Sequence, residues 1–324
     1  MRKLLEAELL NGKFWTDPWS LVEGCTPVSP GCANCWLASM ARRFQPVLVN
    51  PGSGQFNGVI KCREDRLDIP LRARKPRVYA IWSDLFHESV PVDFLNSTFD
   101  TMNKAKHHRF IIITKRPERA ADYLRSWPEW SPMPNVTILV TMEDQDRANE
   151  RAPEAMSLAS VGWKVGALCE PLMGPIDLGR IYSHGESEGG GSWGSWDSCI
   201  SGKRLDVWSD SEVDSPKLAW LITGGESGPS ARPAHPDWVR ALRDQAQAAG
   251  TPFLFKQWGE WAPCRDDYPD PDGLTFGIAT DFDLPHCPQS AATHTWGDHV
   301  FSLRAGKKNT GRIMDGREWL EVPA

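Results

Sequence analysis

The chain has 324 residues, of which 40% are hydrophobic and 24% charged, and its formal net charge is −6 at pH 7. This composition is typical of a globular protein, and the absence of an apolar run near the roughly 20 residues of a membrane span predicts no membrane association. The charged N-terminus lacks the apolar segment of a signal peptide, so we expect a cytoplasmic protein whose eight cysteines stay reduced. An acidic protein does not bind nucleic acid through bulk charge, so any such binding must use local basic patches.

Near the N-terminus, a short strand-like run at 19–24 leads into a loop that carries Cys25, Cys32 and Cys35. The loop is rich in Pro and Gly, and residues 35–44 after it have apolar side chains at helical spacing. The cysteines are therefore expected at a turn from a strand to a helix. The N-terminus of a helix stabilises anionic groups such as thiolates.

From residue 77 onward, short apolar runs alternate with helix-like segments. Such alternation is typical of a parallel sheet that is covered by helices. Counting the run before the cysteines, we predict seven strands, at 19–24, 77–82, 109–114, 135–141, 163–168, 218–223 and 252–255. We therefore expect an α/β fold, a full or partial (β/α) barrel of the TIM type, over residues 1–260.

Polar residues follow the strands of this predicted sheet. The carboxyl ends of barrel strands meet at one mouth, where active sites lie, so these side chains are expected to share a site. They are Ser83–Asp84, Thr114–Lys115–Arg116, Glu143–Asp144, Glu170, Glu226–Ser227 and Lys256–Gln257. Each of them taken singly also fits an ordinary helix cap or polar loop.

Two segments interrupt the pattern, and a third follows it. Residues 183–216 are rich in Gly and Ser and predict a flexible insertion. Residues 262–295 are rich in Asp and Pro and have few apolar runs. Residues 300–319 predict a β-hairpin with Asp315–Gly316 at its turn. The unit 261–324 is thus expected to be an irregular insertion with a small C-terminal β appendage.

The cysteine spacing, C-x6-C-x2-C, allows three interpretations. Structural zinc takes four ligands, usually as two close pairs, but this stretch has one close pair and the first histidine is His87. The thiols could also be unligated. An iron–sulfur cluster fits best, because three thiolates on a four-iron cluster leave one iron open for catalysis.

The cysteine loop resembles that of the radical S-adenosylmethionine enzymes, in which the spacing is commonly C-x3-C-x2-C on the loop after the first barrel strand. The first gap here is three residues longer. The chain resembles more closely the phage and bacterial three-cysteine-motif family, in which Tyr is common at the position of Trp36. The matching motifs are residues 23–36, 83–88, 114–118, 170–174, 224–228 and 255–259.

This resemblance implies a radical S-adenosylmethionine type of barrel and a [4Fe–4S] cluster on Cys25, Cys32 and Cys35, with S-adenosylmethionine on the open iron. The reduced cluster would pass an electron to S-adenosylmethionine, giving methionine and a 5′-deoxyadenosyl radical that abstracts a substrate hydrogen. Catalytic roles are implied for Glu170 and Lys256. Contacts with the cofactor are implied for Trp36, Ser83, Asp84, Thr114, Lys115, Glu143, Gly224, Gly225 and Glu226.

The Gly-Gly-Glu sequence at 224–226 comes late in the predicted barrel. In many members of the superfamily such a motif follows the second strand and binds the methionine amine. Ser83–Asp84 hold that place here, so the amine-binding role is not carried over to Glu226. The two glycines are expected to allow close backbone approach to the adenosine.

The occurrence of the family in phages implies modification or rearrangement of a base in nucleic acid, such as phage DNA. The implied chemistry needs an electron donor such as flavodoxin or ferredoxin. Basic clusters at 72–75, 104–109 and 115–116 fit phosphate contacts, and they equally fit solvated helix faces.

Two other functions stay open. One is a zinc-stabilised nucleic-acid-binding protein without catalysis. The other is a metal-dependent nuclease or hydrolase that uses Asp84, Glu143 and Glu170 at the barrel mouth. The sequence gives neither the oligomeric state nor the class of reaction, whether isomerase, lyase or transferase.

Overall fold

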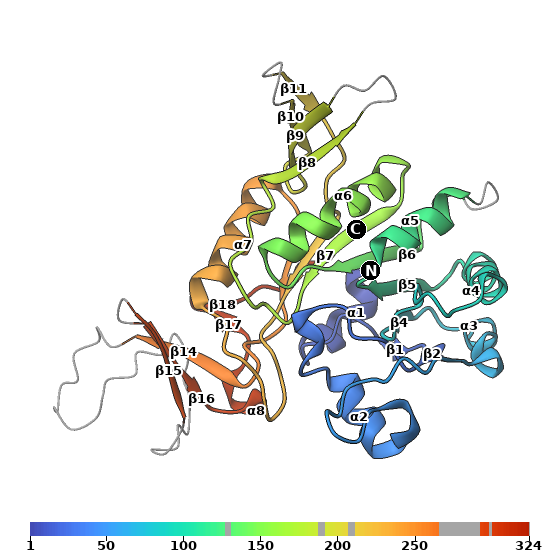
Figure 1. Ribbon diagram of the computed structural model, residues 1–324, viewed down its shortest axis with the longest axis horizontal. Coiled ribbons are helices and arrows are strands. Elements are labelled where there is room, and N and C mark those ends of the chain that lie inside the picture. Colours follow the sequence, from blue (N-terminus) through green and yellow to red (C-terminus); the bar gives the residue numbers. More distant parts are fainter. Residues whose placement is uncertain (127–130, 187–191, 207–210, 266–291, 298–299, 324) are drawn as a thin grey trace.

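The computed structural model describes residues 1–126, 131–186, 192–206, 211–265, 292–297 and 300–323. Its main body is a seven-stranded parallel sheet that curls into a half-barrel (Figure 1). The strands are β1 (Asp17–Pro18), β4 (Val78–Ile81), β5 (Arg109–Thr114), β6 (Val136–Thr141), β7 (Lys164–Cys169), β12 (Trp220–Thr223) and β13 (Phe253–Phe255).

The strands lie side by side in chain order, from β1 at one edge to β13 at the other. This order turns the sheet steadily in one direction, as in a (β/α) barrel. Among the described strands the two edges do not pair with each other, so the barrel is partial. The expected α/β class and the partial barrel are therefore confirmed at this level.

The first strand differs from its prediction. In the sheet, strand β1 covers only Asp17–Pro18, which pair with β4. The backbone N–H of Trp19 makes the last bond to β4, at the carbonyl of Ala80, and its indole Nε1 donates to the carbonyl of Arg66 at 2.8 Å. Within the predicted run, Val22–Glu23 form β2, which pairs antiparallel with β3 (Lys61–Cys62) as a separate ribbon.

Residues of β5 alternate between the two faces of the sheet. Phe110 and Ile112 pack toward the outer helices, while Ile111 and Ile113 pack toward the concave face. Burial on both faces explains why this strand is a continuous apolar run. The outer helices are α4 (Val92–Lys104), α5 (Pro117–Ser126), α6 (Gln145–Ser160) and α7 (Pro236–Ala249).

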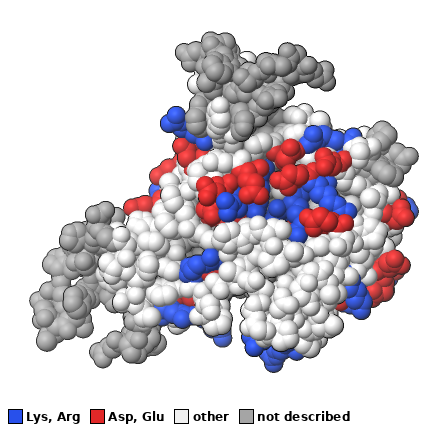
Figure 2. All heavy atoms as spheres, viewed as in Figure 1, with Lys and Arg blue, Asp and Glu red and all other residues white. Residues whose placement is uncertain are grey.

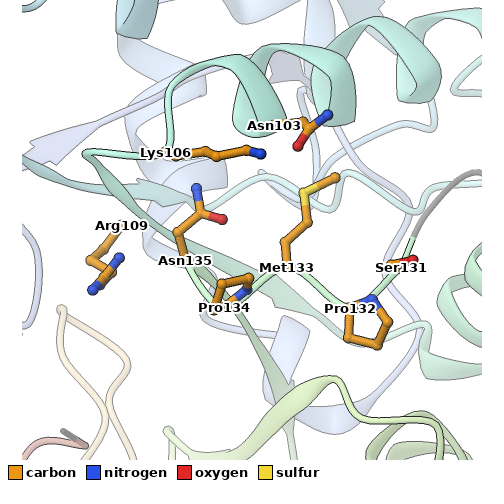
Figure 3. Close-up of a pocket in the computed structure, with 8 residues that line it drawn as sticks. All are labelled: Asn103, Lys106, Arg109, Ser131, Pro132, Met133, Pro134 and Asn135. Carbon is orange, nitrogen blue, oxygen red and sulfur yellow. The ribbon is translucent and has the colours of Figure 1, made fainter.

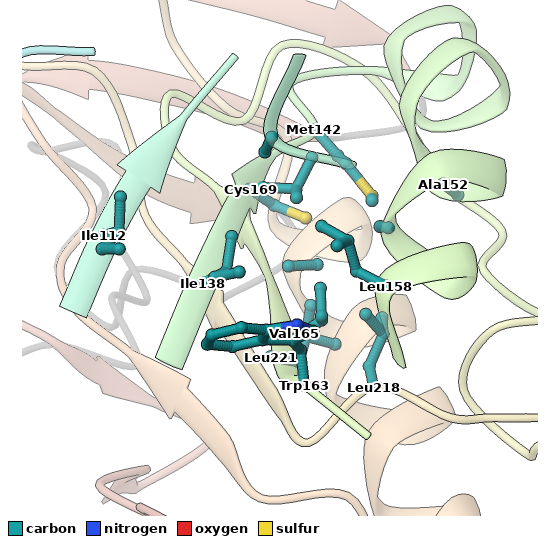
Figure 4. Packing of buried hydrophobic residues seen from close by; sticks show 14 of the residues in the cluster. Ile112, Ile138, Met142, Ala152, Leu158, Trp163, Val165, Cys169, Leu218 and Leu221 are labelled. Carbon is teal, nitrogen blue, oxygen red and sulfur yellow. The ribbon is translucent and has the colours of Figure 1, made fainter. Parts of the chain in front are cut away.

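Figure 4 shows the core between the sheet and the outer helices. Ile138 of β6 lies near Leu158 of α6 and Trp163 in this layer, and each of the three side chains is less than 5% exposed. Tight packing of this kind fixes how the sheet curls and therefore where its carboxyl ends point.

The concave face is filled by a helix that the sequence did not predict, α1 (Arg2–Leu9). Its Leu5 and Leu9 join a second buried cluster with side chains of the sheet such as Trp220. Leu320 near the C-terminus pairs with Leu254 of β13 and packs at the margin of the same cluster. The two ends of the chain thus meet inside the half-barrel.

The segment 183–216, predicted as a flexible insertion, contains most of a four-stranded antiparallel sheet, which extends from the half-barrel in Figure 1. Arg204 and Asp197 bridge two neighbouring strands at 2.5 Å. Its strands are β8 (Ile181–Glu186), β9 (Ser192–Ser198), β10 (Lys203–Asp206) and β11 (Glu212–Asp214).

The C-terminal unit holds a three-stranded antiparallel sheet of β14 (Trp261–Arg265), β15 (Thr293–Gly297) and β16 (Val300–Arg304). Most of the predicted irregular insertion, residues 266–291, lies outside the described residues. Asp315 and Gly316 connect β17 (Ile313–Met314) to β18 (Arg317–Glu318), with φ of 51° and 75°. These positive φ values are those that an Asp-Gly hairpin turn requires.

The remaining short helices are α2 (Trp36–Phe44), α3 (Ile69–Arg72), α8 (Lys307–Thr310) and the 3-10 turns Pro30–Cys32, Pro46–Leu48 and Glu64–Arg66. Helix α2 and the cysteine loop form a lobe beside the open end of the half-barrel (Figure 1). Within the described ranges, no helix has both the length and the apolar character to cross a membrane.

Candidate functional site

The cysteine loop is held by residues that follow the strands of the half-barrel. Arg116, after β5, donates from Nη2 to the carbonyl of Thr26 at 3.2 Å. Asn34 of the loop donates from Nδ2 to the carboxylate of Glu226, after β12, at 3.0 Å. The loop and the strand ends therefore form one site at the mouth.

Asp84, after β4, is buried and serves the protein's own contacts. One of its carboxylate oxygens accepts from Thr114 Oγ1 at 2.7 Å and the other from the backbone N–H of Lys115 at 3.1 Å. Arg116 Nη1 donates to it at 2.9 Å. Asp84 and Thr114, both predicted to contact the cofactor, are thus arranged as residues that position Arg116, whereas the adjoining Ser83 is half-buried.

Arg116 was part of a sequence motif but received no role. Besides its bonds to Asp84 and Thr26, its Nε donates to Glu88 at 2.7 Å, and its Nη1 lies 3.9 Å from Cys25 Sγ. Burial, with a contribution from the charge of Asp84, raises the pKa of the Cys25 thiol to about 11, and Arg116 opposes this shift. The guanidinium is therefore the cation that can stabilise a thiolate at Cys25.

Lys115 occupies the corresponding place at Cys32. Its Nζ lies 3.6 Å from Cys32 Sγ and 3.1 Å from Ser29 Oγ, and it donates to the buried carboxylate of Glu143. Burial by itself would raise the pKa of Cys32, but the Lys115 ammonium and hydrogen bonds from Ser29 lower it below its ordinary value. Burial also raises the pKa of Cys35. Cys32 is thus the thiol that ionises most readily.

Glu143 is the carboxylate that links Lys115 to the core. It is fully buried, and its second oxygen accepts from Nη1 of Arg151 on α6 at 2.9 Å. Burial would raise its pKa, but the charges of Lys115 and Arg151 lower it. The sequence did not predict the role of Arg151, because an Arg in a helix usually faces the solvent. In the structure its side chain is 1% exposed.

Gly31 allows the loop to approach Glu143. A Cβ at this position would lie 2.5 Å from Oε1 of Glu143, which is closer than real contacts. The glycine is therefore required by the packing of the cysteine loop against the carboxylate.

Glu226 closes the other side of the loop. Its carboxylate accepts from the backbone N–H, Nε and Nη2 of Arg232 at 2.8, 2.9 and 2.5 Å, in addition to the bond from Asn34. Arg232 in turn donates from Nη1 to the carbonyl of Pro30 at 3.2 Å. Glu226 was predicted to contact the cofactor, and the structure engages it in fixing the loop.

The two glycines before Glu226 have a structural explanation. A Cβ on Gly225 would lie 1.9 Å from the carbonyl of Trp258, and one on Gly224 would lie 3.4 Å from Glu170. Gly225 is therefore needed where the chain after β12 crosses the chain after β13. The close approach that it permits is to the protein backbone, whereas the sequence predicted an approach to adenosine.

Glu170 and Lys256, the predicted catalytic pair, form a bidentate ion pair with Nζ to oxygen distances of 2.7 and 2.8 Å. The Lys256 ammonium lies 5.7–5.9 Å from the ring centres of Phe14, Trp15 and Trp82. Such rings attract a cation through their electron-rich faces. Sequence reasoning missed this aromatic cage, because its rings come from two separate segments.

Trp36 extends the cage toward the solvent. Its ring contacts that of Trp82 edge-on at 5.6 Å, and the residue is 46% exposed. Since Trp36 directly follows Cys35, the cage adjoins the cysteine loop. The aromatic cage, together with Trp36, and the thiols therefore belong to one site.

The arrangement of donors distinguishes the kinds of metal group that the site could hold. In the part of the chain that the structure describes, no three His, Cys, Asp or Glu side chains are gathered as ligands of a single ion. Asp84, Glu143 and Glu170 each pair with a different cation of the protein. The geometry thus lends no support to a mononuclear zinc or nuclease centre among these residues.

The three cysteines lie on one loop, and their surroundings are the following. All three are free and half-buried. Cys25 and Cys35 pack against a small apolar core that includes Ala38 and Ala41 of α2. Cys32 is close enough to influence the pKa of both other thiols. Iron–sulfur clusters are held by cysteine thiolates, and the apolar and charged groups around the thiolates tune the cluster.

A hollow lies at the opposite end of the sheet, where β5 and β6 begin (Figure 3). Lys106 and Arg109 belong to one of the predicted basic clusters, and both line this hollow. That cluster therefore lies away from the cysteine loop. The lining residues are Asn103, Lys106, Arg109, Ser131, Pro132, Met133, Pro134 and Asn135.

A family model described as "Protein of unknown function (DUF5131)" matches residues 13–323. The chain belongs to this family. Neither the curated proteins nor the solved structures provide a match. The match spans the half-barrel, the cysteine loop and the C-terminal unit, and the family's description names no activity.

Proposed function

We propose that this protein is a radical S-adenosylmethionine enzyme that acts on a base in nucleic acid, as in phage DNA modification. The observation that carries the proposal is the loop with Cys25, Cys32 and Cys35, fixed at the mouth of a parallel half-barrel with Lys115 and Arg116 beside two of its thiols. The three cysteines would hold a [4Fe–4S] cluster with an open iron. Cluster and S-adenosylmethionine together supply a 5′-deoxyadenosyl radical for hydrogen abstraction.

The chain's own residues prepare this loop for three thiolates. Lys115 and Arg116 offset part of their negative charge, and Glu143 and Asp84 hold these cations in place. Glu226 and Arg232 anchor the loop from the opposite side. Residues whose side chains are fixed by such hydrogen bonds give a site the preorganisation that catalysis needs.

Among the ion pairs of the mouth that the structure describes, Glu170–Lys256 makes no bond to the loop, and we assign to it the contacts with the reacting molecules. The ammonium can pair with a carboxylate, and the carboxylate can accept from a hydroxyl or amino group. The exposed ring of Trp36 contacts Trp82, one of the rings around Lys256. Aromatic rings stack on bases irrespective of sequence, which supports a base as the substrate.

Anaerobic reconstitution tests the proposal. We expect about four iron and four sulfide per chain, and cleavage of S-adenosylmethionine to 5′-deoxyadenosine when dithionite is added. The variant Cys32→Ala should lose both properties. A protein that takes up one zinc per chain and no iron would overturn the proposal. A magnesium-dependent nuclease activity that survives Cys32→Ala would instead favour the hydrolase.

A further inference from the structure

The lobe that carries the cysteines has a surface unlike the rest of the molecule. Residues 25–62 contain no Asp or Glu, although the whole chain has a net charge of −6, and they contain the cations Arg42, Arg43 and Lys61. In Figure 2 the tip of this lobe, at the lower edge, is white and blue. A partner that binds here would meet no carboxylate from these residues.

Large apolar side chains are exposed on the same lobe. Met40 and Phe44 lie one helical turn apart on α2 and are 49% and 68% exposed, and Val47 just beyond is 74% exposed. The guanidinium of Arg43 lies 5.2 Å from the ring centre of Phe44. We call this set, with Arg42, the α2 surface. Exposed apolar side chains gathered in this way mark interaction sites.

The α2 surface lies opposite the thiols. Ala38 and Ala41 on the buried side of α2 pack with Cys25 and Cys35, while Met40 and Phe44 point outward. One helix, about 10 Å across with its side chains, separates the two. A protein that docks on α2 is therefore brought within a short distance of the three cysteines.

The composition of the α2 surface fits a protein better than a nucleic acid. Met, Phe and Arg are enriched in protein interfaces, where Asp and Glu are depleted. Three cations among residues 25–62 are few for a surface that binds a phosphate backbone. The exposed cations Arg42 and Arg43 favour an acidic partner.

We propose that the α2 surface docks an acidic one-electron donor protein, of the flavodoxin or ferredoxin kind. This inference rests on the proposed function, since it requires a redox cluster at the cysteines. One electron would pass from the reduced donor to the cluster that Cys25, Cys32 and Cys35 would hold, so that the donor would be oxidised by one electron and the cluster reduced by one. The α2 surface places the donor on the helix that begins directly after Cys35.

The experiment measures binding of the reconstituted protein to a flavodoxin by calorimetry, together with cleavage of S-adenosylmethionine driven either by that reduced flavodoxin or by dithionite. The test variants are Val47→Glu and the double variant Arg42→Glu with Arg43→Glu. The matched controls are Val161→Glu, another exposed Val after α6, and Lys106→Glu at the opposite end of the sheet. All five replaced side chains are exposed, and the iron content shows whether each variant keeps its cluster.

We expect both test variants to bind flavodoxin roughly tenfold or more weakly, since like charges then face the acidic donor, and the dithionite-driven rate to stay unchanged. The controls should match the unmodified protein, and binding should weaken with added salt. If both test variants bind flavodoxin within twofold of the unmodified protein, the inference is overturned. It is also overturned if the test variants keep their affinity for flavodoxin and instead bind DNA more weakly than the unmodified protein does. If the unmodified protein holds no iron, the proposed function itself fails, which is a separate result.

Discussion

The ammonium of Lys115 lies between the carboxylate of Glu143 and the thiol of Cys32, with its Nζ 3.6 Å from the sulfur. Glu143 is fully buried and also receives a bond from Arg151. A buried carboxylate of this kind is stable only when cations and donors surround it. Lys115 therefore neutralises the buried carboxylate of Glu143 and also lies beside Cys32, one of the proposed cluster ligands.

Replacing Lys115 tests this double role. In Lys115→Met, Glu143 keeps only Arg151 and Ser29, so we expect the free energy of unfolding to fall by about 2 kcal/mol. Iron incorporation should also fall, because Cys32 loses its neighbouring cation. Denaturant unfolding and iron analysis measure the two effects. If Lys115→Met takes up iron like the unmodified protein, the cation has no role at the thiol.

Gly31→Ala places a methyl group where Oε1 of Glu143 lies, at 2.5 Å. We expect a loss of stability of about 1–3 kcal/mol, as for overpacked sites, and poor reconstitution of the cluster. Gly52→Ala in the same lobe is the matched control, because a Cβ there meets nothing within 4 Å. Equal melting temperatures for the two variants would contradict the proposed packing.

Glu226 tests the anchoring of the loop. Glu226→Ala leaves the donors of Arg232 and Asn34 without their acceptor, and we expect a destabilisation of about 2 kcal/mol. Glu226→Gln keeps one acceptor oxygen, so its free energy of unfolding should fall by about half as much as that of Glu226→Ala. Limited proteolysis of the cysteine lobe should accelerate in the same order. A larger effect of Gln than of Ala would show that the hydrogen bonds do not hold the loop.

Glu170 and Lys256 test the assigned contacts with the reacting molecules. Glu170→Gln and Lys256→Met should keep the iron content, since neither residue bonds the loop, while cleavage of S-adenosylmethionine slows by roughly 10- to 100-fold, as for a lost hydrogen bond to a charged group. Lys106→Met, at the opposite end of the sheet, serves as the control. Unchanged rates in both variants would remove the pair from the proposed site.

His108 predicts a pH dependence of stability. Its ring is fully buried, Nδ1 accepts from the backbone N–H of Arg77 at 3.1 Å, and Nε2 therefore carries the hydrogen that it donates to the carbonyl of Pro70 at 2.9 Å. Burial, with smaller contributions from His107 and Arg77, lowers its pKa below 6.5.

The lowered pKa means that the unfolded chain takes up a proton before the folded one. The contribution of His108 is thus fully present above about pH 6.5 and is lost as the pH falls through the folded pKa, by at most about 1.4 kcal/mol per pH unit. The difference in unfolding free energy between the unmodified protein and His108→Gln, measured from pH 7.5 to 5, should shrink with falling pH. A constant difference would show that His108 does not titrate.

Much of the fold could be predicted from the sequence. A strand that is buried on both faces must be apolar throughout, so β5 and β6 appear as continuous runs, and the polar residues after them mark the strand ends. The antiparallel sheet formed by β8–β11 could not be predicted, because Gly- and Ser-rich strands resemble a linker. Helix α1 was also not predicted, because its apolar side chains are stabilised by packing against the concave face of the sheet, which is formed by distant parts of the chain.

The sequence alone determined the six strands of the half-barrel from β4 to β13, the three clustered cysteines and the charged residues that share the mouth, because each depends on neighbours in the chain. Only the tertiary structure decided which groups meet: Lys115 with Cys32, Arg151 with Glu143, and Glu226 with Asn34, which is 192 positions away. Such pairs depend on the curl of the sheet, which is set by how its two faces pack. The hydrophobic periodicity of the sequence does not predict how the sheet curls.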